Sequence, residues 1–155
     1  DFGVMTTHAT NTSCPIAATL EVLGEKWTLL ILRDIYRGIN RFNDLEASLG
    51  CPRNLLSTRL KKLVDHGILL EESYQEPGRR ARTAYVLSNK GEDLALVLCA
   101  LQQWGLKHLP QNMDSISYHH ASCDAPVSAA LICAQGHRVE VESLIPIETS
   151  EQDQT

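Results

Sequence analysis

Two short helix-forming segments that meet at one glycine constrain the fold of this chain more than any other feature. Residues 42–49 (FNDLEASL) predict a short helix, and Gly50 marks the turn that ends it. Pro52 then opens a second helix that runs to about His66, where Gly67 supplies the stop. Two short helices joined by a tight, glycine-containing turn are typical of a helix-turn-helix.

The second of these helices has one apolar side and one polar side. The apolar side is formed by Leu56, Leu60, Leu63 and Val64. The opposite side is formed by Asn54, Thr58, Lys61 and Asp65. Because the apolar side must be buried, the polar and basic side faces outward, as it does in the recognition helix of a helix-turn-helix.

A hairpin is predicted directly after the second helix. Residues 68–74 (ILLEESY) and 82–87 (RTAYVL) have the composition of strands, and the segment between them contains Pro77-Gly78, which favours a turn. Arginines follow that turn immediately. A hairpin with arginines at its tip, placed after a helix-turn-helix, is typical of a wing that contacts phosphates or the minor groove.

Charge is unevenly distributed along the chain. The net charge of −5 and the sequence pI of about 5.6 would argue against a nucleic-acid partner. However, residues 51–90 hold eight Lys/Arg against four Asp/Glu, whereas residues 110–155 hold one against seven. The local field decides which partner a surface attracts, so the basic middle of the chain favours a polyanion. A solvated charged face is the alternative explanation of charge alone.

Further helices flank this region. Pro15 and Gly24 delimit an amphipathic helix, and Glu25–Tyr36 is apolar almost all round, which predicts a buried central helix. Ser88 caps a long helix over about 89–109. We expect the first and last helices to form a two-fold interface, with contacts from Ile16, Leu20, Leu98, Leu101 and Trp104. The alternative is a last helix that folds back on its own domain.

The sequence therefore predicts a mainly α protein with a small β-hairpin wing, a winged helix-turn-helix, over residues 14–109. Residues 1–13 are expected to be a flexible arm, with residues 1–4 added ahead of a native start at Met5. Residues 110–147 form an extension with a small β-hairpin, and 148–155 a disordered acidic tail. No signal peptide or membrane-spanning segment is recognisable, and the five cysteines form no dense framework, so we expect a cytoplasmic protein.

Three motifs identify a family. They are CPIAATLEVLGEKWTLLILRDIYRG at 14–38, RFNDLEASLGCPRNLLSTRLKKLVDHGIL at 41–69 and TAYVLSNKGEDL at 83–94. Together they resemble the HxlR family of winged-helix transcriptional regulators. The resemblance implies a bacterial, cytoplasmic homodimer that binds double-stranded DNA and represses or activates nearby genes, often in response to electrophiles, oxidants or metabolites. It also implies dimerisation through the N-terminal and C-terminal helices.

Two positions depart from the family pattern. The recognition helix of the family usually starts with Ile-Ser, whereas Cys51-Pro52 stands there in this chain, so the serine cap is absent. We expect Cys51 to pack inward as a small apolar side chain. The wing sequence PGRRART is richer in arginine than the common family form, which should raise affinity and salt dependence rather than specificity.

The start of the recognition helix is expected to meet base edges in the major groove, through Arg53, Asn54, Ser57 and Thr58. Arg53 and Asn54 are the candidates for base readout, because Arg prefers guanine and Asn prefers adenine. The candidates for phosphate or minor-groove contact are Lys61, Lys62, Arg79, Arg80 and Arg82. Arg59 lies off the polar side, and a structural ion pair is as good an interpretation there as a DNA contact. A dimer places two recognition helices about 34 Å apart, which predicts a pseudo-palindromic operator.

Cys14 is the candidate redox sensor. It stands directly before the first helix, where the partial positive charge of a helix N-terminus favours the thiolate, the form that reacts with electrophiles and peroxide. The family resemblance adds that a cysteine at this place senses oxidants in several members. An inert cysteine near the dimer seam is the alternative. Cys99 and Cys51 are expected to be core residues.

The extension carries His120, Cys123, Cys133 and His137, which could supply four zinc ligands. The paired Cys-x2-Cys knuckles of a zinc ribbon are absent from the sequence, so we expect no metal or other cofactor. The favoured interpretation is a hairpin with strands at 127–134 and 137–144. A Cys123–Cys133 redox pair is the remaining alternative.

These observations predict a DNA-binding repressor rather than an enzyme, because no glycine-rich phosphate loop, paired carboxylates or Ser/His/Asp set is recognisable. Switching by thiol modification at Cys14 is the favoured mode of control. The alternatives are a winged helix used only for protein contacts, and a regulator controlled by a small-molecule ligand or zinc.

Overall fold

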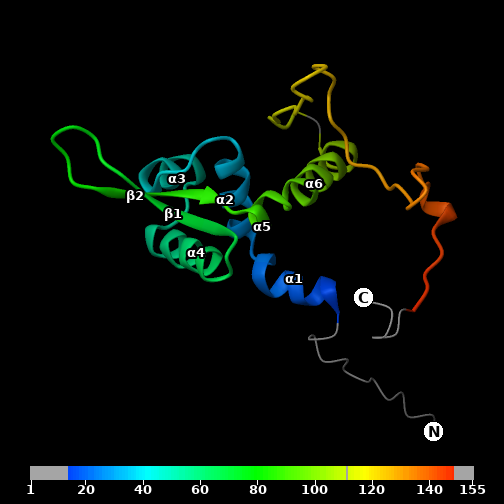
Figure 1. Cartoon of the computed structure of the whole chain (residues 1–155), viewed down its shortest axis with the longest axis horizontal. Helices are drawn as coiled ribbons and strands as arrows, with labels where there is room; N and C mark the ends of the chain where they lie inside the picture. Colours follow the sequence, from blue (N-terminus) through cyan, green and yellow to red (C-terminus); the bar gives the residue numbers. More distant parts are fainter. Residues whose placement is uncertain (1–13, 111, 149–155) are drawn as a thin grey trace, which may run out of the picture. The chain divides into compact units, whose positions relative to one another are not determined.

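The computed structural model describes residues 14–110 and 112–148, which fall into two compact units divided between Leu98 and Cys99 (Figure 1). The first unit carries α1 (Pro15–Leu23), α2 (Lys26–Tyr36), α3 (Phe42–Leu49) and α4 (Arg53–Asp65). The antiparallel hairpin of β1 (Leu69–Tyr74) and β2 (Arg82–Leu87) follows, and then α5 (Asn89–Glu92). Helix α6 (Ala95–His108) continues into the second unit. The predicted winged helix-turn-helix is confirmed.

Local sequence signals account for most boundaries of the first unit. Pro15 occupies the first turn of α1, and Gly50 ends α3 in the left-handed conformation, with φ 62°. Helix α4 begins one residue later than predicted, because Pro52 has extended backbone (φ −54°, ψ 133°) and precedes the first helical residue. No side chain caps α4, in agreement with the expected loss of the family's serine cap.

Helix α2 lies at the centre of the first unit, as its nearly uniform apolar composition predicts. Ile31 and Leu32 are fully buried, and they pack with fully buried leucines of the neighbouring elements, namely Leu45, Leu56, Leu60, Leu63 and Leu69. Cys51 belongs to the same core and is 3% exposed, which confirms the expectation for it. Burial raises the pKa of the Cys51 thiol, and the nearby charge of Arg59 acts in the opposite direction.

One buried carboxylate fixes α2 against α3. The side chain of Asp34 is completely buried, and its Oδ1 lies 2.8 Å from Nη2 of Arg33 and 3.8 Å from Nη1 of Arg37. The hydroxyl of Ser48 on α3 donates to Asp34 Oδ2 at 2.7 Å. A buried carboxylate is tolerated only when it is paired and hydrogen-bonded, so these contacts define one relative placement of the two helices.

The hairpin is anchored to the helix-turn-helix by the residues just before α3. Arg41 forms an isolated antiparallel bridge with Ala84 of β2, and the backbone N–H of Tyr85 donates to the Asn40 carbonyl at 2.9 Å. At the outer end, the backbone N–H of Arg79 donates to the Glu76 carbonyl, with Gly78 at φ 74°. A turn with proline second and a left-handed glycine third matches type II, which confirms the turn predicted at Pro77-Gly78.

The long helix predicted over 89–109 is interrupted, and this expectation was wrong in detail. α5 ends at Glu92 and α6 begins at Ala95. The Gly91 carbonyl accepts from the Leu94 backbone N–H at 3.1 Å and from the Tyr36 hydroxyl at 2.5 Å, and the tight i+3 bond replaces continuous α-helical bonding there. The Ser88 cap is confirmed, since its hydroxyl accepts from the Gly91 N–H.

The strands predicted at 127–134 and 137–144 are not formed. Only the single bridge Ile132↔Arg138 pairs these segments, and the short 3-10 helix η1 (Val141–Ser143) replaces much of the second strand. The side-chain amide of Gln103 donates to the Ala129 carbonyl at 3.0 Å and accepts from the Ala129 N–H at 2.9 Å. Both backbone groups of Ala129 are therefore bonded to α6 instead of a strand, and a two-stranded hairpin alone is only marginally stable.

Two sequence-based expectations concern residues outside the described ranges. The arm over 1–13 lies there completely, and so does the tail apart from residue 148. Within 14–110 and 112–148, no helix has the length and apolar character needed to cross a bilayer.

We predict that Asp34→Asn lowers the free energy of unfolding, because the buried carboxylate loses the charge that pairs with Arg33 and Arg37. The loss should be about 3 kcal/mol, the low end of the range for a broken buried ion pair, because water can still solvate both partly exposed arginines. Asp44→Asn is the matched control: Asp44 lies exposed in the first turn of α3, so its loss should cost about 0.3–1 kcal/mol. Urea unfolding measures both values. Equal stability of the two variants would remove Asp34 from its proposed structural role.

Candidate nucleic-acid interface

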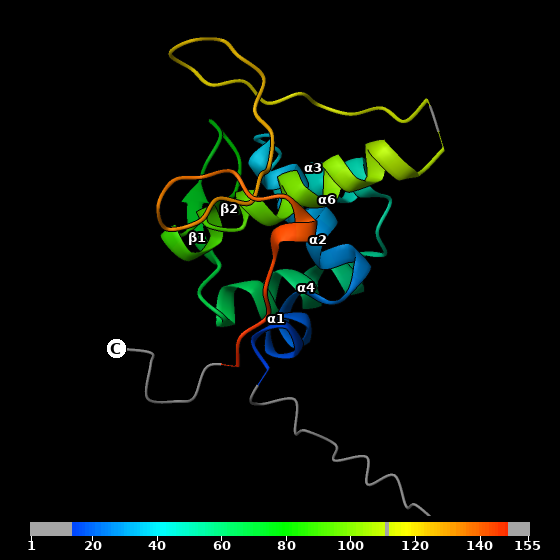
Figure 2. The same cartoon turned by 90° about the vertical axis from the view of Figure 1, so that its right-hand side faces the viewer.

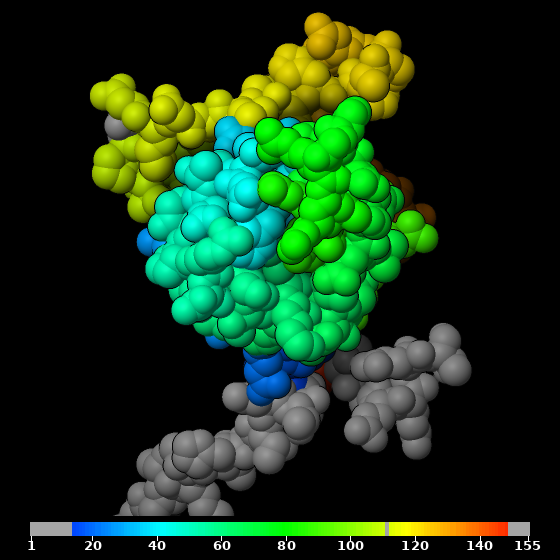
Figure 3. Space-filling view, turned by 90° about the vertical axis from the view of Figure 1, so that its left-hand side faces the viewer, coloured from blue at the N-terminus to red at the C-terminus, as the bar shows by residue number. Residues whose placement is uncertain are grey.

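The polar side of α4 and the wing lie on one face of the first unit. Figure 3 shows the residues of α3 and α4 beside the hairpin on this face, without an intervening element. The predicted contact residues that are exposed there are Arg53, Asn54, Ser57, Thr58, Lys61, Arg79, Arg80 and Arg82. The structure therefore brings together residues that the sequence separates into two segments, and the resulting surface suits the major groove and its flanking phosphates.

The predicted base reader Arg53 is already held by α3. Its Nη1 lies 2.7 Å from Oε2 of Glu46, and its guanidinium lies over the ring of Phe42 at 4.6 Å. The guanidinium is well exposed, and such ion pairs contribute little to stability. Arg53 can therefore exchange Glu46 for a base or a phosphate at small cost.

Asn54 and Ser57 are the available polar side chains at the start of α4. Among the described residues, neither the Asn54 amide nor the Ser57 hydroxyl has a hydrogen-bond partner. The Thr58 hydroxyl donates back to the Asn54 carbonyl at 2.9 Å, which occupies its donor. Because an Asn amide can pair with both N6 and N7 of adenine, Asn54 fits the predicted base readout better than Thr58 does.

Two lysines of α4 differ in the partner that their ammonium groups contact. Lys61 is paired on its own helix with Asp65, at 2.9 Å. Lys62 instead donates to the Glu21 carbonyl of α1 at 2.7 Å, and Figure 2 shows α1 next to α4. Lys62 thus fastens α1 to the recognition helix, which the sequence did not indicate.

Arg59 has the structural role that the sequence left open. It pairs with Glu25 at the start of α2, and its side chain is 20% exposed. Its Nε atom is buried without a hydrogen-bond partner. The side chain is therefore part of the packing between α4 and α2 rather than of the outer face.

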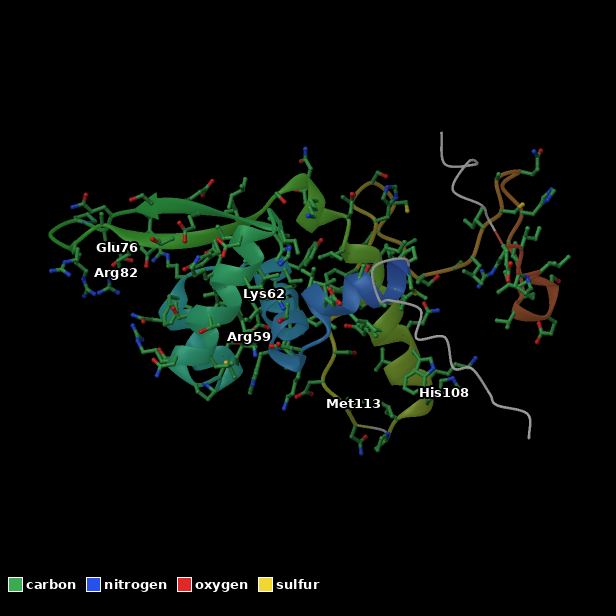
Figure 4. All side chains as sticks on the ribbon, turned by 90° about the horizontal axis from the view of Figure 1, so that it is seen from below. Arg59, Lys62, Glu76, Arg82, His108 and Met113 are labelled. Carbon is green, nitrogen blue, oxygen red and sulfur yellow. The ribbon has the colours of Figure 1, made fainter. Side chains whose placement is uncertain are left out.

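The wing contributes cations together with a carboxylate. Arg80 and Arg82 have no ion-pair partner among the described residues, whereas Arg79 Nε lies 3.9 Å from Glu76. Figure 4 labels Glu76 and Arg82 at the hairpin. Sequence reasoning missed Arg41, which pairs with Glu76 at 2.7 Å and covers the ring of Tyr74. The sequence feature that could have indicated Arg41 was its position directly before the first helix of the predicted helix-turn-helix.

The predicted dimer residues are mostly exposed. On α1, Ile16 is 72% and Leu20 58% exposed, and on α6 Leu101 is 51% and Trp104 60% exposed. Leu98 differs, because it packs partly buried against the core of the first unit. Exposed apolar side chains of this size are typical of surfaces at which proteins associate.

The cysteines outside the core are free. Cys14 is exposed at the N-cap position of α1, and its side chain makes no cap hydrogen bond. Cys99 is partly exposed, so its assignment to the core was wrong: no residue of α6 is buried in the chain. Cys123 and Cys133 are unpaired thiols, so the described residues contain no redox-formed disulfide.

Of the four candidate zinc ligands, two side chains are in contact: His120 Nδ1 lies 3.2 Å from Cys123 Sγ. Cys133 and His137 are joined through their backbones, where the Cys133 N–H donates to the His137 carbonyl at 2.9 Å. Over 14–110 and 112–148, no three His, Cys, Asp or Glu side chains converge as metal ligands would. The pairs offer no tetrahedral set in this conformation.

Comparison with known proteins agrees with the presence of a helix-turn-helix in this chain. A model of the family described as HxlR-like helix-turn-helix matches residues 22–113. The uncharacterized HTH-type transcriptional regulator Rv3095 of Mycobacterium tuberculosis (strain ATCC 25618 / H37Rv) is 35% identical over 133 residues, or 84% of this chain and 83% of that protein.

Solved structures are similar as well. The crystal structure of PA1607, a candidate transcription factor, superposes with a TM-score of 0.76 at 29% identity, over 88% of this chain and 96% of that one. The reduced form of the redox regulator HypR superposes with a TM-score of 0.55 at 25% identity, over 61% and 92%. Its oxidized form has a TM-score of 0.55 at 26% identity, over 66% and 100%.

We predict that Arg80→Ala and Lys62→Ala affect DNA binding differently, although both remove one cation. Arg80 is unpaired among the described residues, so its loss should reduce the slope of log affinity against log salt by about one unit. Lys62 is engaged with α1, so its loss should leave the slope nearly unchanged. Fluorescence anisotropy across a salt series measures both, and an equal loss of slope would make Lys62 a phosphate contact after all.

Proposed function

The chain belongs to the HxlR-like helix-turn-helix family, and from this premise we propose that it binds a specific DNA operator as a homodimeric repressor. It is a transcriptional regulator with a helix-turn-helix DNA-binding fold. One observation carries the finer proposal: α4, whose start holds the available polar side chains, lies beside the hairpin that holds the unpaired arginines (Figure 3). Base edges and phosphates can then be contacted together.

The homodimer is supported by the exposed apolar residues of α1 and α6. Ile16, Leu20, Leu101 and Trp104 are all more than half exposed in the described part of the chain, and apolar surface of this kind favours association with another protein surface. A two-fold dimer presents two α4 helices, so its operator is a pseudo-palindrome with half-sites about 34 Å apart. A dimer seated on such a site obstructs access to the promoter it occupies, and repression is the corresponding mode of action.

Control through Cys14 is supported by its exposure and its position. The thiol is accessible, directly precedes α1, and lies two residues from Ile16 of the proposed dimer surface. Adduct formation or oxidation there changes the size and polarity of the surface that must be covered in the dimer. The similarity to HypR, a redox regulator solved in reduced and oxidized forms, favours this mode of control.

A second mode of control has its own observation. The second unit has a hollow of about 420 Å³ lined by residues of α6 and of the extension, among them Gln102, Lys107 and Tyr118. The lining mixes apolar side chains such as Leu106 and Val127 with a larger number of polar ones, and a hollow of this size can hold a small organic molecule that carries polar groups. Control by such a ligand is therefore the alternative to the thiol.

We predict that selection of genomic fragments by the purified protein recovers an inverted repeat. In the same selection, Asn54→Ala should lose about 1–3 kcal/mol of discrimination at one base pair per half-site, because a bidentate contact to adenine is removed. Arg53→Ala should do the same at a guanine. Single half-sites would contradict the dimer, and fragments without common sequence would favour a winged helix that serves protein contacts.

We predict that Cys14→Ser binds the selected operator as tightly as the wild type but is no longer released by diamide or quinones, since serine cannot form the adduct. Anisotropy with and without reductant measures release. Cys123→Ser is the matched control, because Cys123 is also an exposed thiol and should leave the response intact. Continued release of Cys14→Ser would locate the sensor elsewhere.

A further inference from the structure

A small basic hollow separates the wing from the start of α3. It has a volume of about 160 Å³ and is lined by four arginines together with Tyr74, Asn43 and two carboxylates; the arginines are Arg41, Arg79, Arg80 and Arg82. These arginines come from two elements, the residue before α3 and the hairpin. Several guanidinium groups around one hollow attract an anion to it.

The anion in this structure is the carboxylate of Glu76. Its Oε1 lies 2.7 Å from Arg41 Nη1, and its Oε2 lies 3.9 Å from Arg79 Nε. One carboxylate therefore spans both sides of the hollow. Asp44, the other carboxylate of the lining, has no ion-pair partner among the described residues.

The groups around Glu76 are held in place. The Arg41 guanidinium lies 4.1 Å from the centre of the Tyr74 ring, and its backbone is bridged to Ala84. On the other side, the Glu76 carbonyl accepts the N–H that closes the hairpin turn, and the Gln75 side chain donates to the Arg79 carbonyl at 2.8 Å. The arginines are thus positioned before any ligand arrives, which lowers the entropic cost of binding an anion.

The ion pair between Arg41 and Glu76 is one in which another anion can replace the carboxylate. The side chains are 43% and 48% exposed, and ion pairs with this exposure contribute little to stability. A phosphate can bind a guanidinium through two parallel hydrogen bonds, whereas Glu76 reaches Arg41 through Nη1 alone and Arg79 only at 3.9 Å, so a phosphate can compete with it. The hollow also adjoins the face that carries the DNA-contact candidates.

We propose that Arg41 and Arg79 form a subsite for one backbone phosphate of DNA, and that Glu76 occupies this subsite until DNA displaces it. The inference rests on the DNA-binding function proposed above. Arg41 becomes a DNA-contact residue outside α4 and the wing. Glu76 becomes an internal competitor that lowers the affinity for all sequences alike, because it reads no base.

The test is Glu76→Gln, measured by anisotropy on a short duplex of arbitrary sequence across a salt series. Neutralising the competitor frees Arg41 and Arg79 for phosphate. The affinity at physiological salt should rise about threefold to tenfold, and the slope of log affinity against log salt should steepen by about one unit. Arg41→Gln should make the slope shallower by about one unit. Combining the two substitutions should abolish the gain.

The matched control is Glu71→Gln, which makes the same change in net charge on the same hairpin. Glu71 lies opposite Tyr85 and alternates with Glu72 and Tyr74 along β1, so it points away from the hollow. Its affinity gain should be much smaller, and its slope should equal that of the wild type. Thermal unfolding of each variant shows that the fold is retained.

Three results would overturn the inference. Unchanged or weaker binding by Glu76→Gln would mean that the pair only positions the wing, and an equal gain for Glu71→Gln would mean that net charge alone acts. If the wild type binds DNA and either of these two results is observed, the proposed function stands and only the phosphate subsite fails. Absence of DNA binding by the wild type at low salt would overturn both.

Discussion

The buried carboxylate of Asp34 is the interaction on which the arrangement of the DNA-binding face depends. Apolar contacts between α2, α3 and α4 supply most of the driving force for folding, but they are non-directional. Asp34 adds direction, because it must be reached by Arg33, Arg37 and the Ser48 hydroxyl at the same time. Those contacts place α3 on α2, and Arg41, the residue directly before α3, is bridged to the wing. A chain of contacts through α3 and Arg41 therefore connects Asp34 with the wing.

The outer face is a balance between cations that are engaged and cations that are available. Arg53, Lys61, Lys62 and Arg41 each have a partner in the chain, whereas Arg80 and Arg82 have none among the described residues. Three of these four partners are carboxylates that are at least partly exposed, which phosphates displace at low cost. Charge counts alone would treat every cation of residues 51–90 as a DNA contact. The observed pairs show instead that DNA would have to displace a different partner at each cation, and none at Arg80 and Arg82 among the described residues.

The extension shows where sequence patterns fail to predict secondary structure. Its alternating apolar residues favour strands, yet the backbone of Ala129 is bonded to Gln103 of α6 and only one bridge forms between the two segments. The same limit explains the interruption after α5, where the Tyr36 hydroxyl, more than 50 residues away in sequence, bonds to the Gly91 and Glu92 carbonyls. In both places a distant side chain competes with the local backbone pattern, and no local pattern can reveal such a competitor.

The sequence by itself determined the winged helix-turn-helix. The bounds of α1 to α4 and of the hairpin follow from glycines, prolines and apolar periodicity, which act through local backbone sterics and the burial of one helix face. It also determined which residues carry charge near the recognition helix. Only the tertiary structure decided which of those charges are available, because Glu46 of α3 pairs with Arg53 and Glu25, just before α2, pairs with Arg59, while the Glu21 carbonyl of α1 accepts from Lys62. Ion pairing depends on distance in space, and that distance exists only once the helices have packed.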